Sequence, residues 1–417
     1  MQPRTIRHGH IPALDGLRGV AILAVMLFHL ITACGYGSDA WLTRKIIGVA
    51  VNLWTGVDLF FVLSGFLITG ILLRVRNQPS YFKNFYVRRA LRIFPLYYAA
   101  LIVIFVVLPR FVAFASPDVQ RVFHAQGWVW AYSEDVAIFL HNEDFFDPPG
   151  LWVGHFWSLG VEEHFYLLWP LVVYFCSRRA LTFVSLFVIL ATPLVRGLMV
   201  YLHLDMAMIF TQTFSRTDQL AMGGLLAVSA EVFDYARLAR FARWAVGLSI
   251  AYVVLAMVIQ GGPLWWGHWT ALGPGFSALA LGATGLMVFA VSPEGNPLSR
   301  LLEGRALRTF GKYSYGLYVL HVPLQPLYMY LFPPMAIGSL AAGLGFTASR
   351  VVGLLGFATL GIATTMVLAV FSFHFFEQPF LRLKRFFDYA ARPLHAREPM
   401  KPEIRVDAAG AFAKAGH

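Results

Sequence analysis

Residues 351–373 read VVGLLGFATLGIATTMVLAVFSF, a run without a single charged residue. A transmembrane α-helix needs roughly 20 predominantly apolar residues to cross a bilayer. Shorter apolar runs recur along the chain, for example Ile102–Leu108 and Leu167–Phe175. The 417 residues are 58% hydrophobic and 13% charged, whereas a soluble domain carries about 25% charged residues. The composition therefore predicts an integral membrane protein.

Hydropathy and flanking charges predict an all-α polytopic bundle of about ten transmembrane helices. We expect them at approximately 11–34, 47–73, 90–109, 156–176, 180–200, 210–230, 243–260, 271–291, 309–332 and 351–376. If the N-terminus is cytoplasmic, 26 of the 33 Lys and Arg residues fall on the inner side, and the outer seven are Arg44, Lys45, Arg110, Arg121, Arg196, Arg216 and Arg350. Cytoplasmic segments are enriched in Lys and Arg. The split favours two cytoplasmic termini.

The remaining segments complete a simple domain plan. Residues 1–10 are expected to be a cytoplasmic segment, 11–389 the transmembrane domain and 390–417 a disordered cytoplasmic tail. Residues 110–155 form the one long outer segment, which could bind a sugar, act as a lid or be plain surface. No cleavage site follows Met1–His10, so the first helix is expected to stay in the membrane. The net charge of +11 follows the positive-inside pattern, and no basic stripe with aromatic residues indicates nucleic acid.

A basic residue and a histidine share one face of the predicted first span. The span opens with Leu14-Asp15-Gly16-Leu17-Arg18-Gly19, and His29 lies eleven residues after Arg18. Eleven residues make about three helical turns, which places both side chains on one face about 16 Å apart. Ionisable groups within a bilayer usually face a cavity or a partner. Both are candidate site residues, with Asp15 as a candidate substrate-binding residue. Alternatively, Arg18 is an interfacial anchor and His29 a packing residue.

Two arginines lie together at the inner end of the predicted third span. Arg89 and Arg92 are three residues apart, so they are neighbours on one helix face. Each guanidinium offers a planar fork of donors that suits a phosphate group. The alternative interpretation is anchoring by the positive-inside rule.

The segment 155–166, HFWSLGVEEHFY, opens the predicted fourth span from the outer side. Glu162 lies at a depth similar to that of His29, and a carboxylate with an imidazole could form an acid–base pair. Tyr166 shares a face with Glu162 because the two are four residues apart. Glu163 must point elsewhere and could simply solvate the helix end.

Further polar residues lie in apolar surroundings. Ser64 is within GVDLFFVLSGF at 56–66, together with Asp58, and Ser64-Gly65 could equally mark close helix packing. Arg216 and Asp218 could pair with each other. His321 follows Tyr318 on one side of the ninth span, and Glu377 lies at the inner end of the tenth. Structural and functional roles stay open for this group.

Taken in order, these segments resemble acyltransferase family three, the bacterial membrane-bound O-acyltransferases that act on carbohydrates. The resemblance covers about 360 residues. It rests on Arg18 with His29, on GVDLFFVLSGF, on Arg89-x-x-Arg92, on WSLGVEEHFY at 157–166, on SYGLYVLH at 314–321 and on EQP at 377–379. One departure is His164, where many family members carry Gln.

The resemblance implies a reaction and a set of roles. The donor would be acyl-CoA, by default acetyl-CoA, held by Arg18, Arg89 and Arg92, with no metal. His29, oriented by Glu162, would be the general base, and an acyl-histidine is the variant mechanism. Asp15, Ser64, Glu163, Tyr166 and His321 would contact substrate, and Tyr166 or Ser64 could stabilise the oxyanion. The location would be the bacterial inner membrane, among its lipids. The chain would be a stand-alone member, since only a short tail follows the tenth span.

A transporter or flippase is the competing class, because it too needs many spans and buried charge. We find no inverted repeat in the sequence, and stoichiometric acyl product with free CoA would distinguish the two classes. The acceptor, a carbohydrate or glycoconjugate of the cell envelope or a glycosylated metabolite, is not fixed by sequence. Acyl chain length and oligomeric state also stay open.

Overall fold

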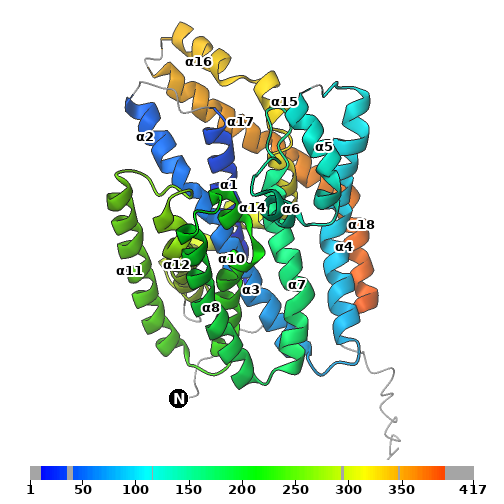
Figure 1. Ribbon diagram of the computed structural model, residues 1–417, viewed down its shortest axis with the longest axis vertical. Helices are drawn as coiled ribbons and strands as arrows, with labels where there is room; N and C mark the ends of the chain where they lie inside the picture. The colour runs from blue at the N-terminus through cyan, green and yellow to red at the C-terminus, as the bar shows by residue number, and fades with distance from the viewer. Residues whose placement is uncertain (1–10, 35–40, 115, 293–294, 346–347, 390–417) are drawn as a thin grey trace, which may run out of the picture.

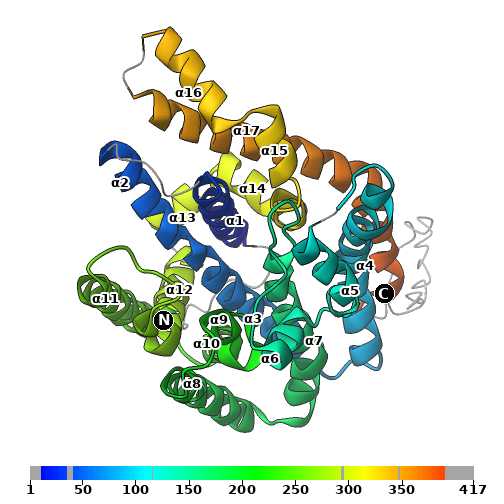
Figure 2. The same ribbon diagram turned by 45° about the horizontal axis from the view of Figure 1, so that its top comes forward.

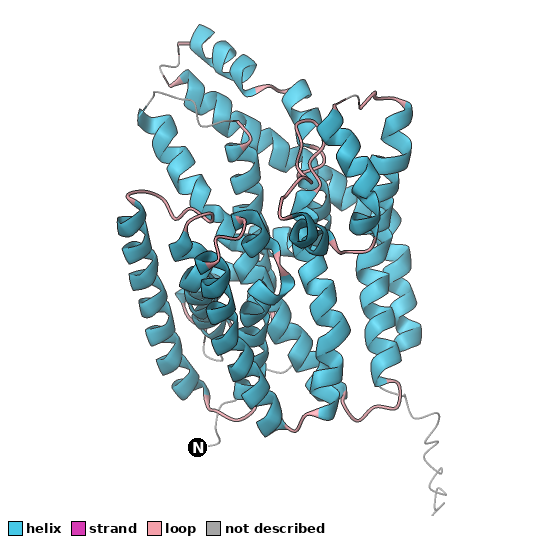
Figure 3. Ribbon diagram, viewed as in Figure 1, coloured by secondary structure: helices cyan, strands magenta, loops and turns pink. Residues whose placement is uncertain are grey.

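The protein is described by a computed structural model, which covers residues 11–34, 41–114, 116–292, 295–345 and 348–389. These residues form helices joined by turns and loops, and no strand occurs among them (Figures 1 and 3). The helices are α1 (Pro12–Thr32), α2 (Trp41–Ala50), α3 (Gly56–Val75), α4 (Tyr81–Ile102), α5 (Pro117–Trp130), α6 (Glu134–His141), α7 (Trp157–Phe175), α8 (Arg178–Tyr201), α9 (Met206–Thr211), α10 (Thr213–Ala230), α11 (Tyr235–Gln260), α12 (Phe276–Ala290), α13 (Pro297–Leu302), α14 (Arg305–His321), α15 (Gln325–Leu331), α16 (Pro334–Gly343), α17 (Ser349–Ser372) and α18 (Gln378–Arg382).

Seven helical stretches in the described part of the chain are long and apolar enough to cross a membrane: Pro12–Thr32, Trp41–Val75, Tyr81–Arg110, Arg178–Tyr201, Tyr235–Gln260, Ala271–Ala290 and Ser349–Phe387. The polytopic helical fold is thus confirmed, while the number of ten spans and the side of the termini stay predictions. Helices α7 and α10 coincide with two further expected spans, whereas the expected span 309–332 is divided into α14, which ends at His321, and α15. Their polar residues, such as Glu162, Asp218 and Lys312, lower their hydropathy.

Helix α1 lies in the middle of the bundle and packs closely against α14 (Figure 2). The crossing depends on glycines, because a Cβ on Gly19 would lie 2.0 Å from the carbonyl oxygen of Leu307. A Cβ on Gly311 would similarly lie 1.8 Å from the carbonyl oxygen of Asp15. Small residues let membrane helices approach at backbone distance. The close crossing brings the C-terminal end of α1, with His29, to the C-terminal end of α14, with His321.

A second close crossing joins α3 to α10. A Cβ on Gly65 would lie 1.9 Å from the carbonyl oxygen of Leu220. Beside this crossing, the fully buried Arg216 pairs with Asp58 of α3, with Nη1 and Oδ1 3.3 Å apart. Asp218 instead pairs with Arg196 of α8 at 2.9 Å. The predicted Arg216–Asp218 pair is therefore wrong, because residues two apart on a helix face different directions. Arg196 and Arg216, which charge counting places on the outer side, lie buried within α8 and α10.

The long outer segment is largely folded onto the bundle. It contains α5 and α6, and its Glu134 and Asp135 are buried at the start of α6. Oδ2 of Asp135 accepts a hydrogen bond from the hydroxyl of Thr213 on α10, at 2.8 Å. These contacts fix α6 over the outer ends of α7 and α10. Residues 1–10 and 390–417, predicted as a cytoplasmic segment and a disordered tail, lie outside the described residues.

Candidate active site

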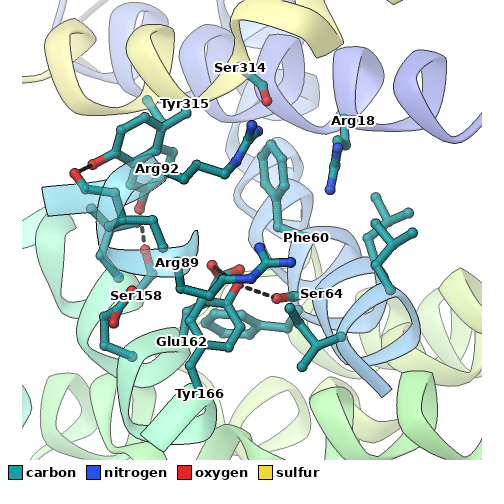
Figure 4. Close-up of a pocket in the computed structure, with 18 of the residues that line it drawn as sticks. Arg18, Phe60, Ser64, Arg89, Arg92, Ser158, Glu162, Tyr166, Ser314 and Tyr315 are labelled. Atoms are coloured by element: carbon teal, nitrogen blue, oxygen red, sulfur yellow. Dashed lines mark hydrogen bonds between the residues drawn. The ribbon is translucent and has the colours of Figure 1, made fainter. Parts of the chain in front are cut away.

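A cavity of about 110 Å³ lies between α1, α3, α4, α7 and α14 (Figure 4). Most of the predicted site residues line it. Polar lining residues are Arg18, Ser64, Arg89, Arg92, Ser158, Glu162, Glu163, Tyr166, Ser314, Tyr315 and Tyr318. Each helix contributes side chains spaced by three or four residues. On α7 these are Ser158, Glu162 and Tyr166, which form one stripe along the helix.

Three arginines reach into this cavity from two helices (Figure 4). Arg89 and Arg92 come from one face of α4, and Arg18 comes from α1. Arg18 lies 3.8 Å from Asp15, one turn earlier on the same helix. Within the described chain, no carboxylate lies within 4.0 Å of Arg89 or Arg92. The cavity is lined by three arginines and two glutamates, and this surplus of positive charge favours the binding of an anion here.

A chain of hydrogen bonds links α3 and α7 across the cavity wall. Tyr166 donates its hydroxyl proton to Oε2 of Glu162 at 2.8 Å, and Ser64 Oγ lies 2.6 Å from the Tyr166 hydroxyl. Because the phenol has only one proton, Ser64 is the donor in the second bond. The guanidinium of Arg89 lies 5.5 Å from the centre of the Tyr166 ring, within cation–π range. The hydrogen bond to Glu162 thereby fixes the Tyr166 ring that contacts the guanidinium of Arg89.

Three histidines meet beside the cavity, beyond the ring of Tyr318. Nδ1 of His29 lies 2.9 Å from the carbonyl oxygen of Val25 and 3.3 Å from Nε2 of His321. The ring of His155 lies against His321, with centroids 5.4 Å apart. Both nitrogens of His155 are buried without a hydrogen-bond partner among the described residues. In the same part of the chain, no group of three His, Cys, Asp or Glu residues has a metal-binding arrangement.

The hydrogen bonds fix the protons of His321 and His29. Nδ1 of His321 lies 2.8 Å from the carbonyl oxygen of Tyr318, and an oxygen of this kind can only accept, so Nδ1 carries the proton. In a neutral imidazole the other nitrogen is then an acceptor. The single proton on Nδ1 of His29 is therefore shared between the carbonyl oxygen of Val25 at 2.9 Å and Nε2 of His321 at 3.3 Å, since both can only accept. It follows that Nε2 of His29 carries a lone pair, and this half-buried side chain can act as a base.

Glu162 does not orient His29, contrary to the expected acid–base pair. Glu162 bonds to Tyr166, whereas His29 bonds to Val25 and His321. The physical reason is that α3 packs between α1 and α7. A similar depth in the membrane therefore does not make the two side chains neighbours. His321, which sequence indicated only as a substrate contact, is the side chain that contacts Nδ1 of His29.

Tyr318 forms the boundary between the cavity and the histidines. Its ring lines the cavity and also lies 5.6 Å from the ring of His321. Its hydroxyl contacts Ser158 Oγ and donates to the carbonyl oxygen of His155 at 2.8 Å. His29 is not among the residues that line the cavity. The arginine end and the histidine end are thus two compartments in this conformation.

Sequence analysis missed Ser158 and His155 as site residues. Both lie in the segment 155–166, and the spacing of Ser158, four residues before Glu162, was a usable signal. His155 has no such periodic signal, because it precedes the helix. Glu163 does more than solvate a helix end: it lines the cavity, and its Oε1 is buried without a partner in the described chain.

Comparison with known proteins shows the family of this chain. The profile of a family described as "Acyltransferase domain" matches residues 11–374. The chain belongs to this acyltransferase family. The predicted resemblance is thereby confirmed, as is the assignment to the acyltransferases. No solved structure matches the chain.

Several bacterial proteins are similar to it. O-acetyltransferase OatA of Staphylococcus aureus (strain NCTC 8325 / PS 47) is 29% identical over 335 residues, which cover 76% of this chain and 50% of that protein. Peptidoglycan O-acetyltransferase OatA of Listeria monocytogenes is 27% identical over 415 residues, covering 93% and 58%. Putative peptidoglycan O-acetyltransferase YrhL of Bacillus subtilis is 27% identical over 427 residues, covering 94% and 58%. The chain therefore spans little more than half the length of these relatives. With the apolar helices, the similarities confirm an integral protein of the bacterial plasma membrane.

Proposed function

We propose that this protein is a membrane O-acyltransferase that moves an acyl group, by default acetyl, from acyl-CoA to a hydroxyl of a cell-envelope carbohydrate. The observation that carries the proposal is the tautomer of His29, whose Nε2 is left free because Nδ1 faces the carbonyl oxygen of Val25 and the acceptor Nε2 of His321. A base of this kind is what transfer to a hydroxyl requires. The printed names of the relatives, peptidoglycan O-acetyltransferases, favour an envelope glycan as acceptor.

The donor would bind with its phosphates at Arg18, Arg89 and Arg92. The residues fit such a group, because guanidinium forks match phosphate oxygens and, in the described chain, neither Arg89 nor Arg92 has a carboxylate within 4.0 Å. Glu162 is then a positioning residue, since it fixes the Tyr166 ring beneath Arg89. The pantetheine arm would extend along the cavity toward Tyr318.

The chemical step uses His29 as general base. Its Nε2 accepts the proton of the sugar hydroxyl while that oxygen bonds to the thioester carbonyl carbon. The carbon–sulfur bond then breaks, and the departing CoA thiolate takes the proton from His29. The products are the sugar ester and free CoA. Neither Ser64 nor Tyr166 has a free proton for the oxyanion, because both are donors in the chain to Glu162.

Contact between thioester and His29 requires a change at Tyr318. In the present conformation the ring of Tyr318 stands between the cavity and His321. A rotation of this side chain would break its bonds to Ser158 and His155 and join the two compartments. We therefore expect acyl transfer to depend on both His29 and the mobility of Tyr318.

The proposal is tested with purified protein in nanodiscs, radiolabelled acetyl-CoA and a cell-envelope glycan extract. Wild type should release CoA in equal amount to acetylated glycan, His29→Ala should release none, and Arg89→Ala should require more acetyl-CoA. His124→Ala is the matched control, because His124 is exposed on α5. Undiminished transfer by His29→Ala would refute the mechanism. Substrate movement without CoA release would instead indicate a transporter.

A further inference from the structure

The last described segment of the chain lies along α4. It consists of α18 and the following 3₁₀ turn Leu383–Phe387, and we call residues 378–389 the C-terminal strap. Both views show α18 beside α4 (Figures 1 and 2). Nη1 of Arg88 donates to the carbonyl oxygens of Lys384 at 3.0 Å and Phe387 at 3.2 Å, and it pairs with Asp388 at 2.9 Å. Asn84 adds a bond to the carbonyl oxygen of Asp388 at 2.9 Å. Arg88 thus fixes the strap.

The strap places one more cation beside the arginines of the cavity. Lys384 is half-buried, and its charge interacts with those of Arg92, Arg89 and Arg88. Arg88 is countered by Asp388, but Lys384 has no carboxylate within 4.0 Å in the described chain. The carboxylate of Glu377 also faces Arg92, although its hydrogen bond goes to Ser372 at 3.1 Å. Like charges held together without counter-charges repel one another, and an anion of several charges would relieve this.

The position of Lys384 along α4 indicates which anion it meets. Arg88 precedes Arg89 and Arg92 on α4, and Lys384 is tied to Arg88 through its backbone. Lys384 therefore lies toward the start of α4, on the side of the arginines away from Tyr318 and the histidines. A CoA molecule has the same order of groups: thioester, pantetheine, pyrophosphate, and then a ribose with a 3′-phosphate. The phosphate farthest from the thioester would thus come nearest the strap.

We infer that Lys384 of the C-terminal strap binds the ribose 3′-phosphate of the CoA donor and so distinguishes CoA from its dephospho form. The inference rests on the proposed function, since it assumes that the cavity takes CoA. Arg89 and Arg92 would hold the pyrophosphate, and Arg88 would act as a positioning residue for the strap. The strap is then part of the donor site as well as the end of the last long helix.

Binding of two ligands to three forms of the full chain in nanodiscs tests this. The ligands are CoA and 3′-dephospho-CoA, and the proteins are wild type, Lys384→Gln and Arg385→Gln. A charge-assisted hydrogen bond contributes about 1.5–3 kcal/mol, which corresponds to about 10- to 100-fold in Kd. Wild type should therefore bind CoA about 10- to 100-fold more tightly than 3′-dephospho-CoA. In Lys384→Gln this preference should disappear, because the affinity for CoA falls while the affinity for 3′-dephospho-CoA stays the same.

Arg385→Gln is the matched control, because Arg385 is an exposed cation of the same strap that rests on Phe386 at 4.8 Å. Arg385→Gln should keep the preference for CoA over 3′-dephospho-CoA. Equal affinity of wild type for the two ligands would overturn the inference, and so would an equal weakening of both by Lys384→Gln. Binding of neither ligand to wild type would overturn the proposed function and this inference with it.

Discussion

Nδ1 of His29 lies 3.3 Å from Nε2 of His321. This contact joins α1 to α14, although the two residues are 292 positions apart in the sequence. The backbone of α14 sets this relationship, because the carbonyl oxygen of Tyr318 holds the proton on Nδ1 of His321. His321 is left as an acceptor toward His29. In the proposed mechanism a neutral imidazole here would take the orienting role that a carboxylate takes in a Ser-His-Asp triad.

Replacement of His321 by Ala should lower kcat and leave the KM for acetyl-CoA nearly unchanged. The reason is that His321 contacts the base, while the arginines of the donor site lie in the other compartment. Loss of an orienting partner typically costs about 10- to 100-fold, and we expect kcat to fall by about that factor. Steady-state kinetics with a fixed glycan acceptor measures both constants. A rise in KM at constant kcat would show that His321 binds donor instead.

The buried pair of Arg216 and Asp58 should be a strong determinant of stability. Arg216 is also enclosed by aromatic rings, with the centre of Phe276 at 3.8 Å. Removing one partner of a buried pair leaves an uncompensated charge and costs about 3–5 kcal/mol. Arg216→Met should therefore strongly lower the thermal midpoint in detergent, and the double variant with Asp58→Leu should recover much of the loss. Additive effects of the two substitutions would contradict this account.

The outer segment should make stability depend on pH through Glu134. Burial raises the pKa of this carboxyl well above its ordinary value of 4.5, and the charges of Asp135 and Asp144 act in the same direction. The folded protein therefore keeps a proton that the unfolded chain loses as pH rises above about 4.5. The free energy of unfolding falls with rising pH until the folded pKa is reached.

We expect Glu134→Gln to flatten this dependence and to raise the thermal midpoint at pH 8. Thermal unfolding between pH 5 and 8 is the measurement. Glu143→Gln serves as the control, since Glu143 is exposed and pairs with Arg121 at 2.9 Å. An unchanged slope in Glu134→Gln would mean that Glu134 ionises in the folded protein.

Gly311→Ala should impair both stability and catalysis, because its new Cβ would meet the carbonyl oxygen of Asp15 at 1.8 Å. Overpacking of this kind costs about 1–3 kcal/mol. Separation of α1 from α14 would also displace His321 from His29, so kcat should fall. Gly247→Ala on α11 is a matched control, because nothing lies within 4 Å of the added atom. Unchanged activity in Gly311→Ala would show that α1 and α14 can accommodate the added methyl group without displacing His321 from His29.

Sequence analysis predicted the helical membrane fold and most of the cavity lining. The apolar runs gave the helices, and the three- and four-residue spacings gave the correct faces of α4 and α7. Periodicity shows which side of a helix is buried but not which helix lies against it. Glu162 was therefore paired with His29, although α3 separates their helices. Arg216 was paired with Asp218 for the same reason, because helical periodicity does not show that Asp58 of α3 lies against Arg216.

Lys384 shows a different limit of sequence reasoning. In the sequence it is one of several cations after the last span, and charge counting assigns all of them to membrane orientation. Only the bonds from Arg88 to the backbone of the strap bring it to the arginines of α4. A long-range contact to main-chain carbonyl oxygens leaves no pattern of residue types in the sequence from which it could be predicted.

The pairing of α1 with α14, and of α4 with the strap, sets an order of events during synthesis. The ribosome delivers His29 and the arginines before His321 and the C-terminal strap. A nascent chain that does not yet contain α14 and the strap thus has a His29 without its contact to His321 and a donor site open at one end. Under the proposed function, thioester turnover would begin only after these later segments have been made, which would protect the acyl-CoA pool from partly synthesised copies.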